Sequence, residues 1–171
     1  MSRTGVDVLV PDAAAMRALG RTVAGLLRAG DLVVLTGPLG AGKTTLTQGL
    51  GEGLGVRGPV TSPTFVISRE HPSLRGGPAL VHVDAYRLGG GLDQMEDLDL
   101  DVSLPESVVV VEWGEGKVEG LSPDRLQVHI AWAGAGPAAD DHVGEEPRRV
   151  GFRPTGARWA AVDVSSLARL A

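Results

Sequence analysis

The chain has 171 residues, 43% of them hydrophobic, and a formal net charge of −5. This length is typical of one domain with a real core, and no apolar run approaches the roughly 20 residues of a membrane span. The absence of cysteine excludes disulfides, thiolate metal sites and cysteine nucleophiles. The acidic balance argues against strong autonomous binding of RNA or DNA. The N-terminal sequence lacks a signal-peptide core, so a cytoplasmic protein is expected.

The first third of the chain predicts two strands that alternate with two helices. Val6–Val10 alternates as a half-buried strand does. Asp12 is a good helix N-cap, and the helix that it opens has its apolar residues on one face and Gly30 as its C-cap. Residues 31–37 (DLVVLTG) are typical of a strand that is covered on both faces. A second helix is expected over 42–54.

The rest of the chain predicts mostly strands. They are expected over 64–70, 79–84, 107–113, 125–133 and 148–154, the last two as a hairpin. A short acidic helix over 93–100, an exposed acidic loop over 133–147 and a C-terminal helix over 156–171 complete the set. The order predicts an α/β, P-loop NTPase-like three-layer fold in a single domain over 1–171, whose mixed sheet has parallel central strands and antiparallel late strands.

A phosphate-binding motif follows the apolar strand. The pattern G-x-x-x-x-G-K-T is complete from Gly37 to Thr44. Its glycines let the backbone curl so that the amides, together with the helix N-terminus, form an anion site. Lys43 is expected to reach the β- and γ-phosphates, and the Thr44 hydroxyl to ligate Mg²⁺. The nucleotide-binding residues predicted here are Gly37, Pro38, Leu39, Gly40, Ala41, Gly42, Lys43, Thr44 and Thr45.

Two carboxylates stand where a hydrolase needs them. Hydrolysis requires acidic groups near the γ-phosphate, and their usual source is the carboxyl end of a buried strand beside the loop strand. Asp84 ends the sequence ALVHVD, and Glu112 ends SVVVVE. One is expected to hold Mg²⁺, directly or through a water, and the other to orient the attacking water, with the two roles left open. The alternative is that each only caps a strand end.

Three further features of the sequence can be interpreted. The segment 61–65 (TSPTF) follows the loop helix, where nucleotide switches place a hydroxyl residue such as Thr64, but a Ser-Pro pair also opens a turn. Trp113 is expected either against the nucleotide base, against a partner or in the core. His82 lies inside a buried strand and is interpreted as a core histidine.

Together these motifs resemble the TsaE (YjeE) family. The stretches GPLGAGKTTLTQGL, SPTF, HVDAYRL and VVVVEWGE occur in its order and spacing, and the resemblance covers residues 12–130. It implies an ATPase of bacterial tRNA threonylcarbamoyladenosine synthesis that binds ATP with Mg²⁺ and hydrolyses it slowly alone. The implied partners are TsaB-like and TsaD-like proteins, whose transferase needs the hydrolysis for repeated turnover. The resemblance implies contact with tRNA only through that complex.

The resemblance also implies roles for single residues. Lys43 matches the phosphate contact, Thr44 the Mg²⁺ ligand, Ser62–Phe65 the switch-like segment, Asp84, Tyr86 and Arg87 the H-x-D-x-Y-R run, Glu112 the Mg²⁺-linked glutamate, and Trp113 a tryptophan close to the nucleotide. Catalysis is therefore expected from Lys43, Asp84 and Glu112, and metal binding from Thr44 and Glu112. The chain departs from the family at Pro38, where an acid is common. It also departs at the enlarged acidic loop, which leaves the family's arginine without a clear counterpart at Arg148 or Arg149.

Other protein classes share the phosphate loop. A small-molecule kinase of the shikimate or nucleoside type needs an arginine-bearing lid, and the strands predicted after Glu112 leave little room for a helical one. A GTPase switch needs an N-K-x-D guanine-reading motif, which the sequence lacks. A nucleotide-binding structural protein is a fourth class. The function predicted is the ATPase of a tRNA-modification complex, with a small-molecule kinase as the alternative.

Overall fold

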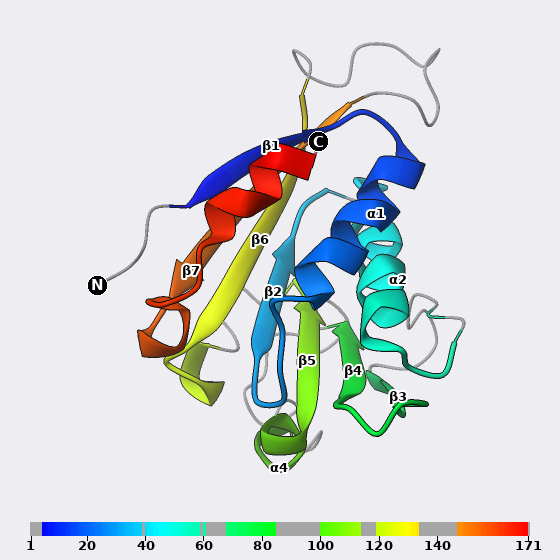
Figure 1. The fold of residues 1–171 in the computed structure, drawn as a ribbon, viewed down its shortest axis with the longest axis vertical. Coiled ribbons are helices and arrows are strands. Elements are labelled where there is room, and N and C mark those ends of the chain that lie inside the picture. The colour runs from blue at the N-terminus through cyan, green and yellow to red at the C-terminus, as the bar shows by residue number, and fades with distance from the viewer. Residues whose placement is uncertain are drawn as a thin grey trace.

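The computed structural model contains one seven-stranded mixed sheet, in which the first and the last strand of the chain are neighbours (Figure 1). The structure describes residues 5–38, 40–58, 60, 68–84, 100–113, 119–133 and 147–170. Among these residues, no helix is long and apolar enough to cross a membrane.

The sheet is parallel at its centre and antiparallel at both edges. In spatial order its strands are β1 (Val6–Val10), β7 (Arg148–Thr155), β6 (Arg125–Trp132), β2 (Leu32–Thr36), β5 (Ser107–Glu112), β4 (Ala79–Asp84) and β3 (Ser68–His71). Strands β6, β2, β5 and β4 are parallel to one another, whereas β1, β7 and β3 run antiparallel to their neighbours. The predicted α/β fold is confirmed. Antiparallel pairing late in the chain begins at β7, because β6 is parallel to β2.

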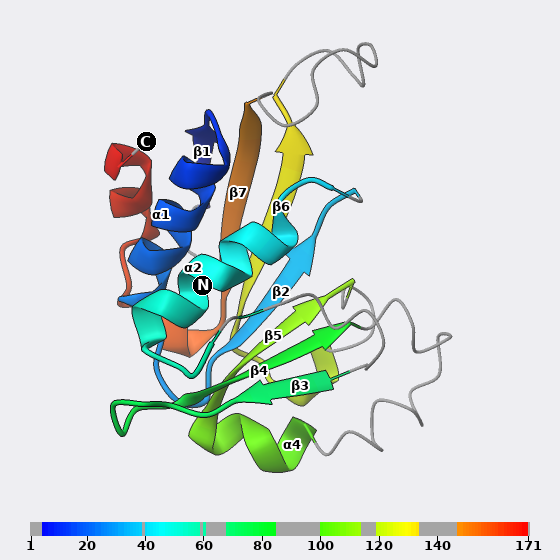
Figure 2. The ribbon, with the colours of Figure 1, turned by 90° about the vertical axis from the view of Figure 1, so that its right-hand side faces the viewer.

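Helical segments cover the two faces of the sheet unequally. Helices α1 (Ala13–Ala24) and α2 (Lys43–Leu54) and the 3₁₀ helix η5 (Val164–Leu170) lie on one face, over the larger apolar core, as Figure 2 shows. The short helix α4 (Leu100–Ser103) and the 3₁₀ turn η2 (Leu104–Glu106) pack on the other face. Every residue of β5 is buried, as its apolar sequence predicts for a strand covered on both sides.

The phosphate-loop helix is held against α1 by close backbone contact. A Cβ atom added at Gly49 of α2 would overlap the backbone carbonyl of Arg17, and it would lie 3.0 Å from the Cα of Gly20 in α1. Only glycine allows two helices to approach so closely. The start of α2 is therefore fixed relative to the sheet by its packing on α1.

Helix α1 starts where the sequence predicts but ends early. The Asp12 carboxylate accepts a hydrogen bond from the Ala15 amide, as an N-cap does. The prediction of Gly30 as the C-cap is wrong, because α1 ends at Ala24 and Gly25 is its C-cap. Tertiary contacts explain the early end: the Leu26 carbonyl accepts from the Arg158 guanidinium, and the Arg28 amide donates to Asp31. Gly30, with φ of 96°, belongs to the turn before β2.

The C-terminal segment is not the single helix that the sequence predicts over 156–171. It forms two 3₁₀ helices, η4 (Ala157–Trp159) and η5, and the Asp163 carboxylate accepts from the Ser165 amide at the start of η5. The split lets Trp159 and Leu167 both reach the core, where they are 1% and 0% exposed. The remaining 3₁₀ helix, η3 (Glu119–Leu121), precedes β6.

Some predicted elements lie outside the described residues. These are residues 64–67 of the strand expected over 64–70, nearly all of the acidic helix expected over 93–100, and positions 134–146 of the expected acidic loop. The described residues of the strand expected over 64–70 belong to β3. The described ends of the expected loop follow β6 and precede β7.

Candidate functional site

The predicted phosphate loop connects the carboxyl end of β2 to the first residue of α2. Gly42 is the N-cap of α2 and has φ of 113°, a backbone conformation that a residue with a Cβ rarely adopts. No side chain caps this helix end, so the first amides of α2 remain available to an anion. Leu39 lies outside the described residues, and the other predicted loop residues, Gly37 to Thr45, follow the expected strand–turn–helix path.

Lys43 is folded back onto its own loop. It is only 6% exposed, and its Nζ atom donates to the carbonyls of Gly37, at 2.7 Å, and Pro38, at 3.0 Å. Burial lowers the pKa of Lys43 below its usual value, while the negative charges of Glu112 and Asp84 act in the opposite direction. The ammonium group thus lies in the electrostatic field of both carboxylates that the sequence selects.

Those two carboxylates stand side by side on neighbouring strands. Asp84 and Glu112 are register partners at the ends of β4 and β5, and Glu112 is also opposite Leu35 of β2. The Trp113 amide donates to the Leu35 carbonyl at 3.0 Å, which ties the end of β5 to the loop strand. Because parallel strands end at the same edge of the sheet, three segments distant in sequence meet there.

A pocket of about 230 Å³ occupies this meeting point. It is lined by Gly40, Gly42, Lys43, Thr44, Thr45, Asp84, Glu112 and Trp113. Loop glycines, the Lys43 cation, the hydroxyl groups of Thr44 and Thr45 and both acids therefore line one cavity. A second pocket, of about 180 Å³, lies between β1 and α1, and its lining is apolar apart from backbone and Thr22.

Trp113 belongs to the site and not to the core. Its ring centroid lies 4.5 Å from the Lys43 Nζ atom, within the range of a cation–π contact. Its φ of 62° makes Trp113 a non-glycine residue in the left-handed region, which costs about 1–3 kcal/mol and persists only where the surroundings enforce it. This backbone turn directly follows Glu112 and brings the ring over the loop.

His82 is the residue that the sequence analysis missed. Its side chain is fully buried, and its Nε2 atom lies 2.8 Å from the Glu112 Oε2 atom, on a carboxylate that is itself 7% exposed. The interpretation of His82 as a core histidine describes its burial but not this contact. Strand alternation places His82 on the same face as Asp84, two positions later, but it does not predict the contact with Glu112 on the neighbouring strand.

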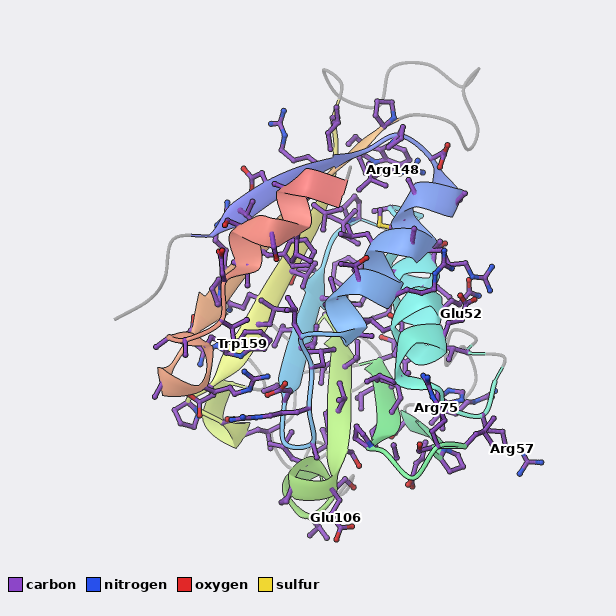
Figure 3. The ribbon with its side chains drawn as sticks, viewed as in Figure 1. Glu52, Arg57, Arg75, Glu106, Arg148 and Trp159 are labelled. Atoms are coloured by element: carbon purple, nitrogen blue, oxygen red, sulfur yellow. The ribbon has the colours of Figure 1, made fainter. Side chains whose placement is uncertain are left out.

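The structure leaves other predicted residues away from the pocket or undescribed. Thr64, Tyr86 and Arg87 lie outside the described residues. Arg148 is at the start of β7 and places its guanidinium 4.1 Å from the Trp132 ring centroid. Figure 3 shows Arg148 at one end of the sheet and Glu106 at the other. Neither Arg148 nor Arg149 is among the residues that line the pocket.

Comparison with known proteins gives one consistent family. Residues 10–136 match the model of the family described as "Threonylcarbamoyl adenosine biosynthesis protein TsaE". The chain is 69% identical over 153 residues to the tRNA threonylcarbamoyladenosine biosynthesis protein TsaE of Streptomyces coelicolor, covering 90% of this chain and 99% of that protein. It is 38% identical to the protein of that name from Bacillus subtilis, over 84% of this chain and 82% of the relative.

A solved structure shares the fold. The crystal structure of YdiB from Bacillus subtilis superimposes with a TM-score of 0.73 at 30% sequence identity, covering 99% of this chain and 97% of that one. The family suggested by the sequence motifs is thus confirmed by sequence relatives and by structural similarity.

Proposed function

This chain belongs to the TsaE family of tRNA threonylcarbamoyladenosine biosynthesis, and from that premise we propose that it is a Mg²⁺-dependent ATPase that supports repeated turnover of a TsaB–TsaD transferase. The observation that carries the proposal is the single pocket that joins Lys43 and Thr44 to the carboxylates of Asp84 and Glu112. A phosphate loop alone supports binding, whereas carboxylates beside it support hydrolysis.

The donor set of the pocket fits Mg²⁺. The groups next to Lys43 are the Thr44 hydroxyl and two carboxylates, and hard oxygen ligands of this kind, few in number, suit an ion that keeps several waters and phosphate oxygens. In the proposal Thr44 and Glu112 hold the ion, and Asp84 orients the attacking water. When bound, Mg²⁺ would neutralise negative charge on the β- and γ-phosphate oxygens.

The protein's own groups supply the remaining stabilisation. In the proposal, the free amides at the start of α2 bind phosphate oxygens. The Lys43 ammonium gives up its hydrogen bonds to the carbonyls of Gly37 and Pro38 and donates to the transferring phosphate instead. The ring of Trp113, which already covers the Lys43 ammonium, shields this exchange from water. Preorganised charges in such a partly enclosed site act more strongly than they do in water.

The proposed partners follow from the family, and the charge of the chain bears on what it binds directly. A net charge of −5 does not favour direct binding to the phosphates of tRNA. We therefore assign tRNA binding to TsaB-like and TsaD-like proteins, with this chain as their ATPase.

The kinase alternative gains no support from the fold: in the part of the chain that the structure describes, β5 is followed by two strands and 3₁₀ turns, and no helical lid is present.

The test combines hydrolysis with tRNA modification. Lys43→Ala should lower ATP hydrolysis about 100- to 1,000-fold, the cost of losing one preorganised electrostatic group. With TsaB, TsaD and tRNA, the variant should permit a first round of modification but not repeated rounds. Arg21→Ala, on the exposed surface of α1, is the control and should retain both activities. Full multi-round modification by TsaB and TsaD without this protein would contradict the proposal.

A further inference from the structure

We propose that His82 is a positioning residue that holds the Glu112 carboxylate in the orientation needed to bind Mg²⁺. The inference rests on the proposed function, because it assigns Glu112 to the ion. His82 does not line the pocket and acts only through Glu112. It is therefore a supporting residue for the site and not a catalytic one.

The two strands fix the geometry of this pair. In the parallel pairing of β4 with β5, Asp84 is opposite Glu112, and His82 is opposite Val110. Alternation places His82 and Asp84 on the same face of β4, and Val110 and Glu112 on the same face of β5. His82 is therefore a diagonal neighbour of Glu112, on the adjacent strand and two positions farther from the carboxyl ends of the strands. Its Nε2 atom meets Oε2 at 2.8 Å.

The hydrogen-bond pattern of His82 is what distinguishes it from a packing residue. An ionised carboxylate only accepts hydrogen bonds, so the hydrogen of a neutral imidazole belongs on Nε2. The buried Nδ1 atom has no hydrogen-bond partner within the described part of the chain. An apolar side chain at position 82 would fill the same space without leaving a polar atom unpaired. The one polar contact that the imidazole makes is therefore with Glu112.

This contact restricts what Glu112 can do. With Oε2 engaged by His82, the Oε1 atom has no protein partner among the residues described here, and Glu112 lines the pocket. One oxygen is thus anchored to the core, and the other is left for an ion. Hydrogen bonds to metal-binding carboxylates orient them, and their loss costs about 10- to 100-fold in metal affinity or activity.

The experiment compares His82→Leu with His82→Gln. Leucine removes the donor, whereas the glutamine amide nitrogen can occupy the position of the imidazole Nε2 atom. Three quantities are measured: Mg²⁺ affinity by calorimetric titration of the ADP-bound protein, kcat for ATP hydrolysis, and ADP affinity without Mg²⁺. We expect His82→Leu to weaken Mg²⁺ binding and kcat by about 10- to 100-fold, and His82→Gln to recover most of both. ADP affinity without Mg²⁺ should stay within about twofold of the wild type, since the loop contacts are unchanged.

Two controls separate positioning from folding. His71→Leu removes a second buried histidine, on β3, whose Nδ1 atom contacts the Arg57 carbonyl and not the pocket. It should lower stability without changing Mg²⁺ affinity or kcat. In a Glu112→Gln background, His82→Leu should have little further effect, because residues that act through one group are not additive.

The outcomes distinguish this inference from the proposed function. Wild-type Mg²⁺ affinity and kcat in His82→Leu would overturn the role of His82 while leaving the ATPase intact. Equal loss in the leucine and glutamine variants, or full additivity with Glu112→Gln, would overturn it as well. A wild-type protein that binds ADP but neither Mg²⁺ nor hydrolysable ATP would instead overturn the proposed function, and the role of His82 with it.

Discussion

Two buried carboxylates at opposite ends of the parallel strands have different surroundings, and we assign one to folding and, in the proposed ATPase, the other to chemistry. Asp31 directly precedes β2, and Glu112 ends β5. Both are nearly inaccessible, at 4% and 5% exposure. They differ in their partners. Asp31 accepts three hydrogen bonds, which engage both of its oxygens, whereas Glu112 accepts one within the described part of the chain, from His82.

The Asp31 carboxylate is enclosed by donors. Arg158 contacts it twice, through Nε and Nη2, both at 3.0 Å, and the Arg28 amide donates at 2.8 Å. The same guanidinium donates to the Leu26 carbonyl and stacks 4.6 Å from the Trp159 ring centroid. This pair joins the C-terminal segment to the turn between α1 and β2. Both oxygens of the Asp31 carboxylate are therefore engaged by donors from the protein itself.

Glu112 has the opposite arrangement. It faces the pocket, beside Lys43 and Asp84, and leaves one oxygen free of partners among the described residues. Burying a charge without full pairing is costly, so this end of the sheet is less stable than it could be. The comparison shows that the two carboxylates differ in their pairing and not in their burial, and the proposed ATPase places its chemistry at the one that is incompletely paired.

The largest expected effect is on activity, from Glu112→Gln. The change keeps the shape of the side chain but removes its charge, so hydrolysis should fall about 100-fold or more, while thermal stability stays close to that of the wild type. ATPase assays and thermal denaturation check the two halves. The comparison would fail if Glu112→Gln lowered stability and spared hydrolysis.

The next effect is on stability, from Asp31→Asn. Removing one partner of a buried ion pair leaves the Arg158 charge uncompensated, which costs about 3–5 kcal/mol in the free energy of unfolding. Hydrolysis per folded molecule should be unchanged, because Asp31 is at the far end of β2. Urea denaturation measures the loss.

A matched control for Asp31→Asn is Asp7→Asn. Asp7 pairs with Arg153 at 2.9 Å, but both side chains are about half exposed, at 51% and 47%. Such a pair contributes less than about 1 kcal/mol. Equal destabilisation by the two substitutions would mean that the Asp31–Arg158 pair does not owe its effect to burial.

The smallest expected effect is a pH dependence from His71, which lies beside β4 in the sheet. Burial lowers the pKa of His71 below its usual value, and the Arg57 carbonyl opposes the shift only in part. Because the unfolded chain then binds a proton more readily than the folded one, the stability from His71 is fully present above about pH 6.5, the usual histidine pKa, and falls as the pH drops below it. His71→Leu should flatten this part of the stability–pH curve. Identical slopes in the two proteins would exclude His71 as the source.

Much of this arrangement was predictable from local sequence. The glycine motif from Gly37 to Thr44 requires a strand before it and a helix after it, and both are present. Asp84 and Glu112 were predictable for the same reason, since each ends an apolar run of a length suited to a buried strand. The position of Gly30, the two 3₁₀ helices at the C-terminus and the role of His82 were not predictable from local pattern.

The sequence by itself determined the phosphate loop, the strands that carry the two acids and the family of the protein, because these depend on residue types at fixed short spacings. Only the tertiary structure decided what each buried polar group does. Whether Asp31 pairs with Arg158, 127 positions away, and whether His82 meets Glu112, 30 positions away, depends on which segments become neighbours. Chain topology sets those contacts, and no local spacing encodes them.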